Sequence, residues 1–157
     1  MISIEQEIKS IFDSICWKLN RGAVCNYQAS LGLFHASAED TRNLSEGALV
    51  LAILGSDTVA NFFRSCTIEE MLLEISECIG WKGDDTSFPN RKYHMKEAYL
   101  QDIAKAFSAI RSLLNSGSEI STFVIEKGHP FYPVYWEFAY LIRAAHASYV
   151  LVGSCSD

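Results

Sequence analysis

Acidic side chains concentrate in the middle of the chain, where they could bind a basic partner. Six carboxylates fall within 17 residues, and Lys82 is the only basic residue among them. On most helices such a stripe is simply solvated, but complementary charge also speeds association between proteins and selects the partner. We therefore predict a partner-binding surface that includes these six residues: Glu69, Glu70, Glu74, Glu77, Asp84 and Asp85.

Six aromatic residues fall among the ten residues 131–140. Because alternate side chains of a strand point to opposite faces, one set of them faces the core: Trp136, Phe138 and Tyr140. Tyr132 and Tyr135 do not belong to that set. Aromatic residues beside a charge are typical of binding surfaces, so these two complete the predicted partner-binding residues. We interpret Glu137 as solvent-facing or paired with Arg143.

The histidine and cysteine spacings predict neither a metal site nor a catalytic centre. The four histidines are scattered, and the five cysteines contain no C-x-x-C or zinc-finger spacing. The familiar phosphate-loop, hydrolase, metalloprotease and calcium-loop motifs are also missing. A nucleophilic triad could be assembled from Cys25, His129 and Glu137, but nothing in their spacing requires it. We predict no catalytic residue, no metal ligand and no cofactor, and keep a small hydrolase using that triad as an alternative.

The charge balance argues against a nucleic-acid partner. Thirteen basic and 19 acidic side chains give a formal net charge of −6. Binding to nucleic acid needs clustered Lys and Arg, and the largest cluster, Arg91, Lys92 and Lys96, is too small to predict it. An odd number of irregularly spaced cysteines indicates a reducing compartment. The start of the chain does not resemble a signal peptide, and the longest apolar run, residues 48–54, is too short to span a membrane. We expect a cytoplasmic protein with no membrane partner.

The spacing of apolar residues predicts the elements that carry these side chains. A length of 157 residues and a hydrophobic share of 49% predict a single domain, residues 1–157. Steps of three and four predict helices over residues 4–19, 68–79 and 95–114, and Thr67 with Glu70 forms a capping box before the second. β-branched and aromatic runs predict strands at 120–125, 134–143 and 149–152.

Residues 23–66 give a weaker pattern. Residues 29–35 fit either a strand or a helix, and we favour helices at 45–54 and 57–65. The order of elements predicts an α+β fold in which the helices pack on one face of a small antiparallel sheet formed mainly by the C-terminal third.

The C-terminal segment resembles the end of small bacterial immunity-type proteins. It joins a P-x-x-W-E strand, Pro133 to Glu137, to a tail of the form G-S-x-S-D, Gly153 to Asp157. The resemblance implies a non-enzymatic protein that binds and neutralises a cognate toxin, often a basic nuclease. The leading prediction is therefore an immunity or inhibitor protein that acts through an acidic and aromatic surface. A structural subunit of a homo-oligomer, joined through the edge of the aromatic strand, is a further alternative.

Overall fold

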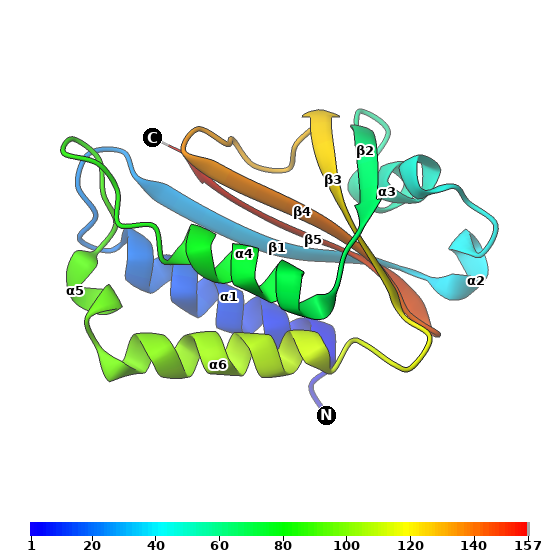
Figure 1. Ribbon diagram of the computed structural model, residues 1–157, viewed down its shortest axis with the longest axis horizontal. Helices are drawn as coiled ribbons and strands as arrows, with labels where there is room; N and C mark the ends of the chain where they lie inside the picture. Colours follow the sequence, from blue (N-terminus) through cyan, green and yellow to red (C-terminus); the bar gives the residue numbers. More distant parts are fainter. Residues whose placement is uncertain (157) are drawn as a thin grey trace.

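A five-stranded antiparallel sheet organises the molecule, in the strand order β1-β5-β4-β3-β2 (Figure 1). The computed structural model describes residues 1–156. The strands are β1 (Gln28–Ser37), β2 (Val59–Ser65), β3 (Glu119–Lys127), β4 (Trp136–Arg143) and β5 (Ala147–Ser156). Three of the five come from the C-terminal third of the chain, and together with the helices they confirm the predicted α+β fold.

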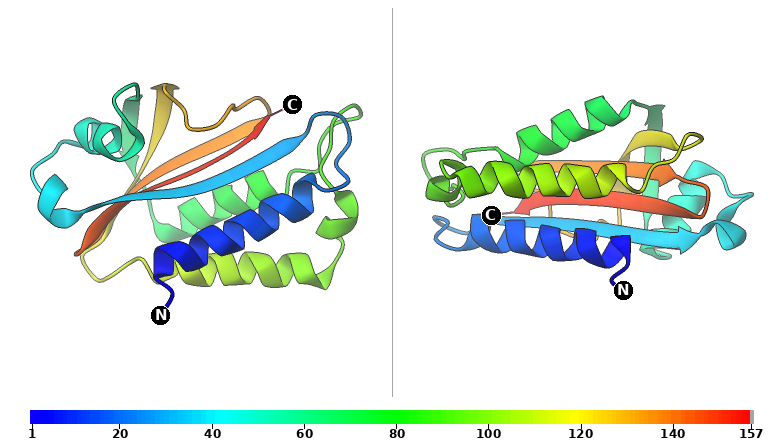
Figure 2. Two further views of the ribbon diagram at one scale, coloured as in Figure 1. Left: turned by 180° about the vertical axis from the view of Figure 1, so that it is seen from behind. Right: turned by 90° about the horizontal axis from the view of Figure 1, so that it is seen from below.

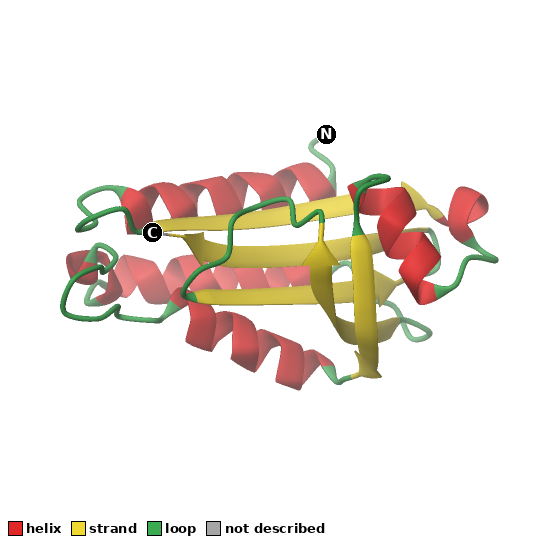
Figure 3. Cartoon of the chain, turned by 90° about the horizontal axis from the view of Figure 1, so that it is seen from above, coloured by secondary structure: helices red, strands yellow, loops and turns green. Residues whose placement is uncertain are grey.

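Helices lie on both faces of this sheet (Figures 2 and 3). One face carries α1 (Ile4–Asn20), α4 (Ile68–Ile79) and α6 (Glu97–Arg111), with the short α5 (Arg91–His94) before α6. α3 (Glu46–Leu54) covers part of the other face, and the short α2 (Ala38–Thr41) follows β1. The prediction that the helices pack on one face alone was wrong, because α3 buries Leu49 and Val50 against the second face.

The sheet therefore separates two apolar cores. The core on the side of α1, α4 and α6 contains the even-numbered side of β4, as predicted: Phe138, Tyr140 and Ile142. The odd-numbered side of β4, predicted to be mixed, places Ala139 and Leu141 in the second core with residues of α3. β4 and β5 are consequently buried on both faces, as central strands of a covered sheet are.

Local capping signals determine where the helices begin. At α4 the Thr67 hydroxyl accepts from the Glu70 backbone N–H (3.1 Å), and the Thr67 N–H donates to the Glu70 carboxylate (2.8 Å), which is the predicted capping box. The helix predicted over residues 95–114 is confirmed in a shorter form as α6, and the separate short helix α5 precedes the predicted range. Lys96 adopts an extended conformation (φ −89°, ψ 146°), which starts α6 anew and lets the buried Tyr93 pack on it.

Residues 23–66 contain the two strands β1 and β2 and the two helices α2 and α3. Residues 28–37 form β1, which pairs with β5 along its whole length, and the predicted helix at 45–54 is confirmed as α3. The helix favoured at 57–65 was wrong. Residues 59–65 instead form β2, an edge strand whose pairing with β3 is interrupted by two register shifts. Phe63 holds β2 in place by stacking on Phe123 at a ring-centroid distance of 5.1 Å.

Candidate binding surfaces

The carboxylates predicted to bind a partner do not all face solvent freely. Glu70 caps α4, as described above. Glu74 is half-buried and accepts a hydrogen bond from the Tyr140 hydroxyl of β4. Asp84 accepts from the backbone N–H groups of Ser87 (2.8 Å) and Thr86 (2.7 Å), and these bonds hold the pKa of its carboxyl below the ordinary range. Three of the six therefore support the local structure.

The outward side of α4 keeps Glu69, Leu73 and Glu77, which are all exposed and are spaced one helical turn apart. We call these three residues the acidic face. The Glu69 carboxylate lies 3.6 Å from the Arg111 guanidinium of α6, and both side chains are largely exposed to solvent. Glu77 lies in the last turn of α4, which contains no basic residue. A carboxylate there faces the negative end of the helix dipole, so Glu77 does not stabilise its own helix.

Burial is the main cause of the raised pKa of Glu74. Its carboxyl group lies between α4 and the sheet, and the nearby Glu77 carboxylate raises the pKa further, whereas Arg64 lowers it. Glu77 of the acidic face therefore disfavours ionisation of Glu74 on the same helix.

The two predicted tyrosines have different surroundings. Tyr135 stacks on Trp81 with ring centroids 4.9 Å apart, and Trp81 in turn stacks on Tyr27 at 6.1 Å. This three-ring stack joins the segments before β1, after α4 and before β4, so Tyr135 has a packing role. Tyr132 is 74% exposed and remains available to a partner. Asp85 is also exposed, in the loop after α4.

The structure brings together two members of the possible Cys25, His129 and Glu137 triad. The His129 Nδ1 atom accepts from the Phe131 N–H (2.9 Å), and its Nε2 atom lies 3.4 Å from the Glu137 carboxylate; burial lowers the pKa of His129. Cys25 is exposed in the loop before β1, and no hydrogen bond or ion pair in residues 1–156 joins it to the other two. Glu137 faces His129 and not Arg143, whose guanidinium donates to the Leu44 carbonyl (2.9 Å).

Two further findings concern the whole described chain. Residues 1–156 contain no group of three or more His, Cys, Asp or Glu side chains placed to hold a metal ion. No helix in this range has both the length and the apolar character required to cross a bilayer.

A pocket that the sequence reasoning missed lies between the C-terminal end of α1 and residues 88–98. It has a volume of about 700 Å³ and is lined by five basic residues, which we call the basic pocket: Lys18, Arg21, Arg91, Lys92 and Lys96. Only the three that follow residue 90 form a visible cluster in the sequence. The available signal was the spacing of Lys18 and Arg21, three residues apart at the end of a predicted helix, but the sequence did not show which segment they would meet.

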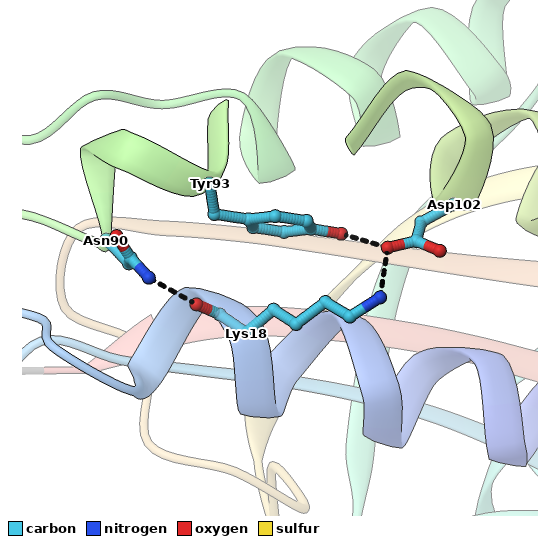
Figure 4. Close-up of polar contacts among 4 residues, drawn as sticks. All are labelled: Lys18, Asn90, Tyr93 and Asp102. Carbon is cyan, nitrogen blue, oxygen red and sulfur yellow. Dashed lines mark hydrogen bonds and ion pairs between the residues drawn. The ribbon is translucent and has the colours of Figure 1, made fainter. Parts of the chain in front are cut away.

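A hydrogen-bond network fixes one wall of the basic pocket (Figure 4). The Lys18 ammonium and the Tyr93 hydroxyl both donate to the same Asp102 oxygen, each at 2.7 Å. Asn90 donates through its side chain to the Lys18 carbonyl (3.2 Å) and through its backbone to the Leu19 carbonyl (2.9 Å). Burial alone would raise the pKa of Asp102, but the Lys18 and Tyr93 hydrogen bonds outweigh it and lower that pKa.

Two guanidinium groups lie over aromatic rings at the same pocket. Arg21 lies 4.7 Å from the ring centre of Trp17, and Arg91 lies 3.8 Å from that of Phe88. Arg91 also donates to the carbonyls of Lys82 (3.0 Å) and Asp84 (3.1 Å). Stacking on a ring restricts a flexible arginine side chain while leaving the edge of its guanidinium available to an anion.

Comparisons with known proteins identify the fold and nothing finer. No family model matches the chain, and no curated protein matches it either. Among solved structures, the crystal structure of citrus MAF1 superposes with a TM-score of 0.55. The match covers 95% of this chain and 98% of that one, with 14% sequence identity. At that identity the similarity concerns the α+β architecture alone.

Proposed function

We propose that this protein acts by binding, and that the acidic face of α4 recognises a basic surface of a partner protein. The acidic face presents two carboxylates on either side of an exposed leucine. A small apolar centre with charged residues around it is a common arrangement in protein interfaces. Charge complementarity then accelerates encounter and discriminates among partners.

The position of Glu77 carries this proposal. Helices are normally stabilised by cations in their last turn, and α4 has none there. Glu77 instead adds negative charge near the helix end and next to the half-buried Glu74. Since this charge opposes the stability of the helix, a role in recognition explains its presence better than a role in folding does.

Leu73 provides a second reason. It is 61% exposed on the outward side of α4, although the inward side buries Met71, Leu72, Ile75 and Ile79 in the core. Leu73 is therefore not needed to hold α4 on the sheet, and it supplies the apolar contact that an interface centre requires.

More specifically, we propose that the chain is an immunity protein that neutralises a basic toxin in the bacterial cytoplasm. Support comes from the C-terminal resemblance, because the described parts of its two segments meet in neighbouring strands: Trp136 is opposite Cys155, and Glu137 is opposite Ser154. Asp157 lies outside the described residues. Cys16, Cys25, Cys66 and Cys78 are free thiols, which fits a reducing compartment. Tyr132 and Asp85 extend the proposed surface as further partner-binding residues.

The homo-oligomer alternative has less support. It required a free edge on the aromatic strand, but β4 lies inside the sheet between β5 and β3. The edges of the sheet are β1 and β2.

The proposal is tested by comparing proteins captured from the native host by three forms of the chain. These are the wild type, Glu69→Gln/Glu77→Gln, and the control Glu7→Gln/Glu39→Gln, which removes two exposed carboxylates outside α4. We expect a partner with a basic domain to be retained by the wild type and the control and lost by the α4 variant. Identification of that partner as a toxin, inhibited in a purified assay, would support the immunity form. Equal capture by all three forms would contradict the role of the acidic face.

A further inference from the structure

The basic pocket gathers positive charge in a molecule whose net charge is negative. Five of the 13 basic side chains line this one pocket, in a chain whose net charge is −6. Of these five, only Lys18 forms an ion pair with a carboxylate in the described part of the chain. Within residues 1–156, Arg21, Lys92 and Lys96 form no ion pair. Like charges gathered without counter-charges repel one another, so their convergence indicates an anionic ligand.

The geometry of the pocket fits recognition of phosphate groups. Lys92 and Lys96 are exposed on neighbouring turns, and their ammonium groups have no hydrogen-bond partner in the described structure. Arg21 is held over Trp17, and its guanidinium forms no hydrogen bond with the other residues that the structure describes, so its donors remain available for bidentate binding to an anion. Asp102, the carboxylate that pairs with Lys18, also accepts from Tyr93, and it forms no ion pair with Arg21, Lys92 or Lys96 in residues 1–156.

Aromatic surface beside the cations suggests that the ligand also carries a planar ring. Trp17 lines the pocket and is 57% exposed, which is unusual for so large an apolar side chain. Planar bases stack on such rings, and each stacked base contributes about 1–3 kcal/mol to binding. The volume of about 700 Å³ lies within the range of small-molecule sites and suits one ring with its phosphates.

We infer that the basic pocket binds a nucleoside polyphosphate, with the phosphates between Arg21, Lys92 and Lys96 and the base against Trp17. This site is formed by the C-terminal end of α1 and residues 88–98, and the inference is independent of the acidic face on α4. It assigns a small-molecule ligand to a protein for which the sequence predicted none.

The inference is tested by titrating the purified protein with ATP, tripolyphosphate and adenosine while following tryptophan fluorescence and heat. We expect ATP to bind, tripolyphosphate to bind at least about fivefold more weakly, and adenosine to bind more weakly still, since each lacks one of the two contacts. Lys92→Gln/Lys96→Gln should weaken ATP binding at least about tenfold. The control Lys9→Gln/Lys127→Gln, which removes two exposed lysines outside the pocket, should leave it unchanged.

Each contrary result overturns a defined part of the inference. No binding of either ATP or tripolyphosphate, or equal weakening by the control variant, would refute the site. Equal affinity for tripolyphosphate and ATP would refute stacking of the base. Much tighter binding of a single-stranded oligonucleotide than of ATP would refute a small-molecule ligand. Lys92 and Lys96 are exposed, and their ammonium groups form no hydrogen bond or ion pair in residues 1–156, so their replacement should leave the fold intact. Glu69→Gln/Glu77→Gln should bind ATP normally.

Discussion

Lys18 on α1 and Asp102 on α6 form an ion pair of 2.7 Å between residues 84 positions apart in the sequence. The same carboxylate oxygen accepts the Tyr93 hydroxyl, so a single side chain connects α1, α5 and α6 (Figure 4). This connection holds the end of α1 against the loop that completes the basic pocket. The pocket is thus a consequence of tertiary packing, and its integrity depends on a largely buried carboxylate.

Replacing Asp102 should destabilise the fold. Asp102→Ala leaves the Lys18 ammonium and the Tyr93 hydroxyl without their acceptor, and loss of such partly buried hydrogen bonds costs about 1–3 kcal/mol. Asp13→Ala is a matched control, because Asp13 forms an exposed pair with Lys9 at the same distance of 2.7 Å. Exposed pairs contribute about 0–1 kcal/mol. Urea denaturation measures both variants, and equal effects would contradict the structural role of Asp102.

The contribution of Asp102 should also depend on pH. Its pKa is lowered by folding, so the carboxylate stabilises the protein above the ordinary aspartate pKa, and this stability is lost as pH falls towards the folded pKa. The free energy of unfolding of the wild type should therefore exceed that of Asp102→Asn at pH 7. The difference should shrink below about pH 4. A difference that is constant from pH 7 to pH 3 would show that charge is not involved.

Glu74 should behave in the opposite way. Its pKa is raised in the folded state, so ionisation opposes folding above that raised pKa and has no effect below the ordinary glutamate value. Glu74→Gln removes the charge and retains an acceptor for the Tyr140 hydroxyl. The variant should have a higher midpoint of thermal unfolding than the wild type at pH 7, and the two should converge near pH 4. A lower midpoint at pH 7 would indicate that the carboxylate is needed for the Tyr140 contact.

Gly153 in β5 should tolerate no side chain. A Cβ atom there would lie 2.3 Å from the ring of Phe138, which faces it across the β4–β5 ladder. Gly153→Ala should cost about 1–3 kcal/mol or more through overpacking. Gly117→Ala is the control, because a Cβ atom at Gly117 meets no atom within 4 Å. A smaller residue at position 138, as in Phe138→Leu/Gly153→Ala, should restore part of the lost stability.

The thiols should differ sharply in reactivity. Burial raises the pKa of Cys16 and of Cys78 to about 12, so neither forms much thiolate at neutral pH. Cys25 is exposed, and a disulfide reagent such as Ellman's reagent should modify it first in the folded protein. Cys25→Ser should abolish the fast phase. A fast phase that persists in this variant would contradict the burial of the other thiols, and an inert Cys25 would remove the hydrolase alternative.

The sequence predicted the parts of the fold that depend on local signals. The capping box at Thr67 and the apolar stripes of α1 and α4 required no knowledge of the sheet. β2 was not predicted because its apolar residues do not alternate along the sequence. The irregular pattern corresponds to two register shifts in its pairing with β3 and to the positive φ of 60° at Phe62. Similarly, the second core under α3 depends on β4 being an interior strand, which no local pattern reveals.

The candidate sites were predicted less completely, for a related reason. The acidic residues are visible in the sequence, but their partners are not: Glu74 contacts Tyr140, 66 positions later. The basic pocket combines Lys18 and Arg21 with a segment some seventy positions further along, so neither cluster alone indicates a site. Charged residues that come together only in the folded protein cannot be recognised as one site from their spacing in the sequence.

The central claim is that the acidic face of α4 recognises a basic partner, and the salt dependence of partner affinity tests it most directly. Once the captured partner is purified, its dissociation constant should be measured with the wild type and with Glu69→Gln/Glu77→Gln at low and high salt. We predict that the variant binds about tenfold more weakly at low salt and that the difference largely disappears at high salt, where exposed charges are screened. Equal affinities of the two forms at low salt would contradict the claim.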